Sequence, residues 1–125
     1  MAQIPAVPHG PKPLGPYSVV AEAGCLVFIS GQIAVDPATN TRVDGDAAAQ
    51  ARRIMENLGL ILGDLGLGFD AIVKTTIFLT DIADFAAVNA VYAEFVGAAP
   101  PARSTIQVAA LPGGFRVEIE AVAAR

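Results

Sequence analysis

The chain contains very little cysteine or histidine: Cys25 and His9 are the only residues of their types among 125. One cysteine excludes an internal disulfide, and His9 has no partner at metal-ligand spacing. Cys25 begins the apolar run Cys25–Ile29, so we expect a buried small side chain rather than a reactive thiol. The sequence also lacks a Cys/His nucleophile arrangement and a phosphate-binding loop ending in Gly-Lys-Ser/Thr. We therefore expect neither a metal nor a cofactor.

Charge is scarce as well. Charged residues make up 16% of the chain, against about 25% in ordinary soluble domains, and the formal net charge is −4. The eight basic residues are scattered, with only Arg52 and Arg53 adjacent, which disfavours a nucleic-acid-binding surface. With 54% hydrophobic residues on so short a chain, we expect identical copies to cover part of the apolar surface in a homo-oligomer.

Long hydrophobic runs are missing too. The first 16 residues contain no apolar core of signal-peptide length, and no stretch is long enough to span a bilayer. We expect a cytoplasmic protein without a membrane partner. The length, and the lack of repeats, linkers and low-complexity tracts, predict a single domain over residues 1–125.

The spacing of apolar residues predicts two helices among five main strands. Strands are expected at 17–22 and 25–30 as a hairpin, at 71–80, and at 103–111 and 116–123 around a turn at 111–114, with a loop or small hairpin at 35–41. One helix begins at Asp46 and ends before Gly66; another is capped by Asp81 or Asp84 and ends at Gly97. This ββαβαββ order predicts an α+β sandwich, a sheet with two helices on one face and the other face needing a cover.

Arg103 is the strongest candidate for function. Pro100 and Pro101 precede it, and prolines fit before a strand rather than inside one, so Arg103 lies where the strand begins. Its guanidinium offers a rigid fork of donors that matches a carboxylate or phosphate. A solvated arginine at a strand end is the alternative.

The last predicted strand carries a second candidate pair. Alternation places Arg116, Glu118 and Glu120 on one face and the apolar residues Val117, Ile119, Ala121 and Ala123 on the other. The two carboxylates fit either an acid/base couple or an ion-paired strand face. The preceding strand presents Arg103, Thr105 and Gln107 on one side, so a structural pair between Arg103 and Glu118 or Glu120 also stays open. The groups available for catalysis are Arg, Glu, Tyr, Ser, Thr and the backbone. They suit a reaction in which arginine binds a small carboxylate and glutamate orients water or accepts its proton.

Six blocks, in order along nearly the whole chain, resemble the signature blocks of the RidA/YjgF family of reactive intermediate deaminases. They are Gly15–Ser18, Ser30–Ile33, Ile72–Leu79, Asp84–Asn89, Pro101–Ser104 and Val117–Ala121. The resemblance implies a chorismate-mutase-like α+β fold with a mixed sheet, a homotrimer, and three clefts at subunit interfaces.

The resemblance also implies roles for individual residues. Arg103 would bind the carboxylate of a 2-imino acid, Glu118 would orient the attacking water, and Tyr17 would help to close the site. Ser30 and the backbone of Gly31 would lie beside the ligand.

Two positions depart from the pattern of the family. Thr105, a substrate-binding candidate, stands where several relatives have cysteine, and Val19 replaces a glutamine often found after Gly-Pro-Tyr-Ser. Imine hydrolysis remains the expected reaction, while a thiol-dependent side activity and the substrate range stay open.

The expected function is that of a cofactor-independent 2-iminobutanoate/2-iminopropanoate deaminase, which releases a 2-oxo acid and ammonia. A non-catalytic or regulatory trimer that binds small carboxylates is the alternative, and binding of 2-oxobutanoate without imine turnover would favour it. An RNA-directed role fits poorly with the acidic balance of the chain.

Overall fold

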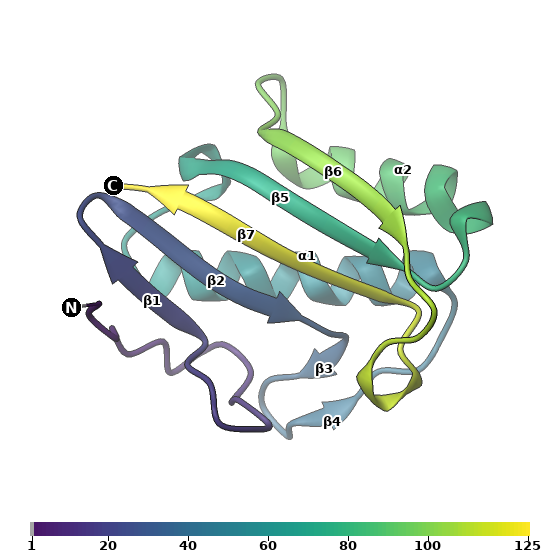
Figure 1. The fold of residues 1–125 in the computed structure, drawn as a ribbon, viewed down its shortest axis with the longest axis horizontal. Helices are drawn as coiled ribbons and strands as arrows, with labels where there is room; N and C mark the ends of the chain where they lie inside the picture. Colours follow the sequence, from purple (N-terminus) through teal and green to yellow (C-terminus); the bar gives the residue numbers. More distant parts are fainter. Residues whose placement is uncertain (1) are drawn as a thin grey trace.

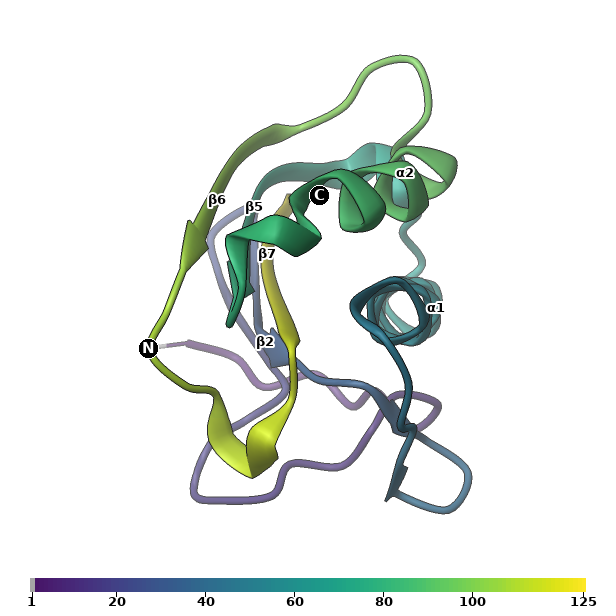
Figure 2. The same ribbon diagram turned by 90° about the vertical axis from the view of Figure 1, so that its right-hand side faces the viewer.

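The computed structural model describes residues 2–125. A five-stranded mixed sheet forms one layer, and both long helices cover the same face of it (Figure 1, Figure 2). The strand order is β1-β2-β7-β5-β6, with bounds β1 (Val20–Ala23), β2 (Leu26–Gln32), β5 (Ile72–Leu79), β6 (Ala102–Gln107) and β7 (Val117–Ala124). The helices are α1 (Ala47–Asp64) and α2 (Phe85–Val96), and a separate hairpin consists of β3 (Val35–Asp36) and β4 (Thr41–Arg42). The expected α+β class is confirmed, as are two helices with a mixed sheet.

The N-terminal hairpin forms as expected, but its turn corrects one prediction. β1 and β2 pair antiparallel up to Ala23 and Leu26, which leaves Gly24 and Cys25 as a two-residue turn, with Gly24 at φ +61°. Cys25 is therefore exposed rather than buried. The apolar run that suggested burial belongs to the strand, which begins one residue later.

Helix α1 supplies much of the core. The carboxylate of Asp46 accepts a hydrogen bond from the Ala49 amide at 2.9 Å and caps the first turn, as expected. The inward stripe of the helix is fully buried at Ile54, Leu58 and Ile61. This apolar stripe packs α1 against the sheet, on the face that α2 also covers (Figure 2).

The last two strands do not form the expected hairpin. β6 pairs in parallel with β5, and β7 lies between β2 and β5, antiparallel to both. A helix between two neighbouring strands makes a parallel crossover, and α2 makes this one between β5 and β6. The segment 108–116 is consequently a loop that crosses the end of β5 between β6 and β7, and it contains the short 3-10 turn Pro112–Gly114.

The alternation expected in β7 is confirmed. Val117 and Ile119 are fully buried beneath the helices, whereas Glu118 and Glu120 lie on the open face. That open face also carries large apolar side chains: Phe28 is 46% and Ile106 is 45% exposed. Isolated exposed apolar residues are ordinary, but these lie on one uncovered sheet face. Within residues 2–125, no helix has the length and apolar character needed to cross a membrane.

Candidate functional site

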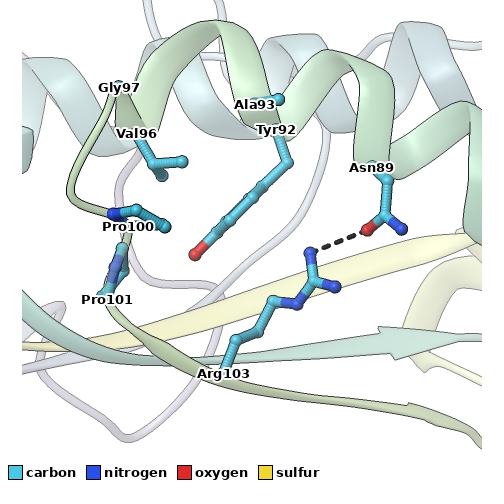
Figure 3. A pocket seen from close by; sticks show the side chains of 8 residues that line it. All are labelled: Asn89, Tyr92, Ala93, Val96, Gly97, Pro100, Pro101 and Arg103. Carbon is cyan, nitrogen blue, oxygen red and sulfur yellow. Dashed lines mark hydrogen bonds between the residues drawn. The ribbon is translucent and has the colours of Figure 1, made fainter.

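Arg103 lines a cleft of about 480 Å³ between α2 and the start of β6, which we call the Arg103 cleft (Figure 3). The double proline Pro100-Pro101 forms one wall, next to the end of α2, and Asn89 and Tyr92 form the helical wall. Pro101 precedes the first residue of β6, so the predicted place of Arg103 at the beginning of a strand is confirmed.

The guanidinium of Arg103 is held from the helix side. One amino group of Arg103 donates a hydrogen bond to Asn89 Oδ1 at 2.7 Å, and the guanidinium carbon lies 5.1 Å from the centre of the Tyr92 ring and 5.6 Å from that of Phe85. The Tyr92 hydroxyl in turn shares a buried 2.7 Å hydrogen bond with Thr75. Within residues 2–125, Arg103 forms no salt bridge. A positioned cation with remaining donors is suited to bind an anion.

Sequence reasoning assigned no role to Asn89, although a signal was present. Phe85, Asn89 and Tyr92 lie at positions i, i+4 and i+7 of one helix, which places them on one face. A polar residue between two aromatic residues on one helix face is the sign that could have identified it.

A second cleft of about 480 Å³ lies beside the open face of the sheet, and we call it the Glu118 cleft. Four of the expected site residues line it together: Tyr17, Ser30, Gly31 and Glu118. Glu120 and Pro112 also line this cleft. The Tyr17 ring is about half exposed, and its hydroxyl accepts a hydrogen bond from the Leu14 amide at 3.2 Å.

A β-bulge in β2 forms one side of this cleft. The register of β2 against β7 pairs Ile29 with Ala121 and Gln32 with Ile119, so that Ser30 and Gly31 together oppose the single residue between them on β7. Bulges of this kind re-aim side chains beside functional sites. The Ser30 hydroxyl donates to the Ser18 carbonyl at 2.7 Å, which ties the bulge to the segment before β1.

Gly31 leaves the space that Glu118 occupies. A Cβ atom at Gly31 would lie 2.8 Å from the carboxyl carbon of Glu118, closer than such atoms approach without displacement. A side chain at this position would displace the carboxyl end of Glu118 from its place beside the bulge.

The carboxylate of Glu118 is electrostatically perturbed. Burial raises the pKa of Glu118 above its ordinary range, and the like charge of Glu120 raises it further. Within residues 2–125 neither carboxylate forms a salt bridge. Perturbed carboxyl groups in a cleft are candidates for proton transfer or for orienting water.

The two clefts do not meet within one chain. Arg103 pairs with Thr75 on the helix-covered face, whereas Glu118 pairs with Phe78 of the same strand β5 on the open face. The sheet thus separates the guanidinium from the carboxylates, so the expected alternative of a structural Arg103–Glu118 or Arg103–Glu120 pair is wrong within the chain.

Thr105 is the expected site residue that lies in neither cleft. It lies two residues beyond Arg103 on the same strand face, and its hydroxyl oxygen is buried without a hydrogen-bond partner among the described residues. A buried hydroxyl without a hydrogen-bond partner is uncommon in folded proteins.

Comparison with known proteins identifies the family. Residues 7–125 match the family model described as Endoribonuclease L-PSP, which covers the RidA/YjgF/RutC proteins. The chain belongs to this family.

Curated members of the RidA/YjgF/RutC family align along almost the whole chain. Protein DfrA of Myxococcus xanthus is 56% identical over 117 residues, which are 92% of this chain and 89% of DfrA. The human 2-iminobutanoate/2-iminopropanoate deaminase is 45% identical over 113 residues, 90% of this chain and 82% of the human protein. The crystal structure of E. coli TdcF with bound serine superposes with a TM-score of 0.89 at 40% identity and 98% coverage of both chains.

The described part of this RidA/YjgF/RutC protein contains no evident set of metal ligands. No group of three or more His, Cys, Asp or Glu side chains is placed to hold an ion within residues 2–125. His9 bonds instead to Asp64, with its ring Nδ1 2.5 Å from Oδ1, and fastens the N-terminal segment to the end of α1.

Proposed function

We propose that this protein hydrolyses 2-imino acids, such as 2-iminobutanoate and 2-iminopropanoate, to 2-oxo acids and ammonia, in a homotrimer with its active sites between protomers. The observation that carries the proposal is the split of the candidate site into an anion-binding half at Arg103 and a perturbed carboxylate half at Glu118. A family that contains deaminases of this name at about 45% identity supports the reaction class.

The assembly follows from the separation of the halves. Because Arg103 and Glu118 lie on opposite faces of one sheet, a complete site needs the Arg103 cleft of one protomer against the Glu118 cleft of another. Such a contact joins two different surfaces, and repeated contacts of this type form a ring when the rotation between neighbouring protomers closes. Three protomers is the ring size that the family resemblance implies, and the exposed apolar side chains of the open face favour burial in such an assembly.

In the proposed reaction, Arg103 binds the substrate carboxylate through two parallel hydrogen bonds. Glu118 orients water and accepts its proton while the water oxygen bonds to the imine carbon. Glu118 then passes this proton to the imine nitrogen, which has taken up the electron pair of the C=N π bond, and a tetrahedral carbinolamine forms. The carbon–nitrogen bond breaks as the proton of the adduct's hydroxyl group moves through Glu118 to the nitrogen, so that ammonia leaves and the carbon–oxygen double bond of the 2-oxo acid forms. Tyr17 closes the site beside Ser30 and Gly31. The step consumes one water and needs no cofactor.

Thr105 belongs to the Arg103 half in this proposal. Its hydroxyl, which lacks a partner among residues 2–125, would complete its hydrogen bonding when the neighbouring protomer and the ligand are in place. It would thereby contribute to substrate selection.

A non-catalytic trimer that binds small carboxylates is the second candidate. The structure of E. coli TdcF with bound serine favours it, because that protein holds a small amino acid. Arg103 alone suffices for binding, whereas turnover also requires the carboxylate half.

The test combines a titration with 2-oxobutanoate and an assay in which semicarbazide traps the imine generated by an amino-acid oxidase. We expect Glu118→Gln to retain 2-oxobutanoate binding and to lose about 10²–10⁴-fold in turnover, the usual contribution of general-base assistance. Glu120→Gln, two residues away on the same strand face, is the matched control.

Two outcomes would contradict the assignment. If Glu120→Gln is the slower variant, or both are equally impaired, Glu118 does not steer the water. If the wild-type protein binds 2-oxobutanoate but hydrolyses no imine, the binding trimer replaces the deaminase.

A further inference from the structure

The loop between β6 and β7 forms a wall of the Glu118 cleft through Pro112. The two residues that follow, Gly113 and Gly114, have φ values of +75° and +72°. Glycine adopts positive φ values without steric strain, but it loses more conformational entropy on folding than other residues because it is more flexible in the unfolded state. The position of Pro112 therefore depends on contacts that hold the adjacent loop.

Arg42 at the end of β4 provides such contacts from outside the cleft. One amino group of Arg42 donates a hydrogen bond to the Gly113 carbonyl at 2.5 Å, and its guanidinium carbon lies 4.2 Å from the centre of the Phe115 ring. Its Nε donates to Asp44 at 2.8 Å, which orients the guanidinium from the side of the small hairpin. In Figure 1 the loop lies beside β4, at the lower edge of the molecule.

The loop is shaped around this arginine. Phe115 is only 5% exposed and anchors the loop beneath the guanidinium. A Cβ atom at Gly113 would lie 2.9 Å from the Phe115 ring, so glycine permits the close approach as well as the positive φ. A second anchor follows at Arg116, whose amide donates to Gln50 Oε1 at 2.8 Å.

We propose that Arg42 is a positioning residue, which holds Pro112 as the wall of the Glu118 cleft by fixing Gly113 and Phe115. Its kinetic consequence rests on the deaminase function proposed above, whereas its effect on the loop does not. Arg42 lines neither cleft itself, and it acts through the loop.

The first measurement needs no substrate. Amide hydrogen exchange in Arg42→Ala should be about tenfold faster at Gly114 and Arg116, as expected for loss of a hydrogen bond from a charged donor. The amide resonances of Gly31 and Glu118 should shift as well. Arg52→Ala is the matched control, because Arg52 is also an exposed arginine, paired with Glu94 between the helices. It should leave the loop and the cleft unchanged.

The second measurement separates positioning from folding. The wall contacts substrate and transition state alike, so Arg42→Ala should raise KM about three- to tenfold with kcat nearly unchanged. A purely structural role would instead lower the active fraction, and so kcat, at constant KM.

Each result decides the proposal. The proposal is overturned if amide exchange at Gly114 and Arg116 is unchanged in Arg42→Ala. It is also overturned if exchange is faster but the amide resonances of Gly31 and Glu118 do not shift and KM stays the same. If the wild-type protein hydrolyses no imine, the deaminase function fails separately. Exchange and resonance shifts then still support or overturn the role of Arg42.

Discussion

Glu118 and Glu120 are identical residues two positions apart on one strand, and their surroundings distinguish them. Glu118 is half-buried against Gly31 at the bulge, whereas Glu120 is exposed. Burial is the larger cause of the raised pKa of Glu118, and the charge of Glu120 is the smaller. The strand alternation identified both carboxylates, but only the packing around each selects one as the candidate base.

The acid limb of the activity profile should report this pKa. Glu118 accepts a proton only when ionised, so kcat/KM should fall as the pH drops through the raised pKa of Glu118. Glu120→Gln removes the like charge, which lowers the pKa of Glu118 and moves the acid limb to lower pH. Because burial is the main cause, the limb should stay above the range of an ordinary glutamate. A pH–rate series on both proteins checks this, and a limb that moves to higher pH would contradict the assignment.

Activity should depend on the guanidinium of Arg103, so that even lysine cannot replace it. Lysine keeps the charge but cannot form two parallel hydrogen bonds with a planar carboxylate. We expect Arg103→Lys to lose about ten- to a hundredfold in kcat/KM, and Arg103→Ala to lose more, since each charge-assisted bond is worth about 1.5–3 kcal/mol. Near-normal turnover by Arg103→Ala in a folded protein would show that the arginine is structural.

At the scale of elements, the bulge in β2 and the crossover through α2 build the two halves of the site. The bulge brings Ser30 and Gly31 to the Glu118 cleft, and the crossover places Asn89 and Tyr92 around Arg103. The bulge and the crossover both depend on pairing between strands that are distant in sequence, and neither produces a periodic pattern of apolar residues. This is why the helices and the alternation of β7 were predictable and the arrangement of the last strands was not.

Gly31→Ala tests the fit between bulge and carboxylate. The new methyl group would overlap the carboxyl end of Glu118, a flexible group that can move, so we expect the protein to fold and turnover to fall at least about tenfold. Gly63→Ala in α1 is the control, because a Cβ there meets nothing within 4 Å, and alanine should leave activity intact while stabilising the helix by about 0.5–1 kcal/mol. Equal activity of the two variants would show that the close approach of Gly31 to Glu118 is not needed for turnover.

At the scale of the whole molecule, a single chain contains both the Arg103 cleft and the Glu118 cleft, and its sheet separates them. Mixed assemblies test whether neighbouring protomers complete each other. When Arg103→Ala and Glu118→Gln chains are unfolded together and reassembled at random in equal amounts, about a quarter of the sites receive both intact residues. Activity should therefore recover to about a quarter of the wild-type level. Activity no higher than that of the separate variants would overturn the shared site, and light scattering that reports a monomer would overturn the assembly itself.

Six blocks of residues, in order along the chain, carried the resemblance to the family. Side-chain spacing also predicted three local features: the capped helix that begins after Asp46, the alternating faces of β7, and the place of Arg103 at the beginning of its strand. These follow from the spacing of side chains along a few turns or residues, which a single sequence records directly. Three other features became clear from the folded chain: Arg103 and Glu118 lie on opposite faces of the sheet, Cys25 lies in an exposed turn, and Arg42 contacts the distant loop at Gly113. Strand order and long-range packing set these contacts, because β5 separates β6 from β7 and the free energy of burying α1 and α2 selects one face of the sheet.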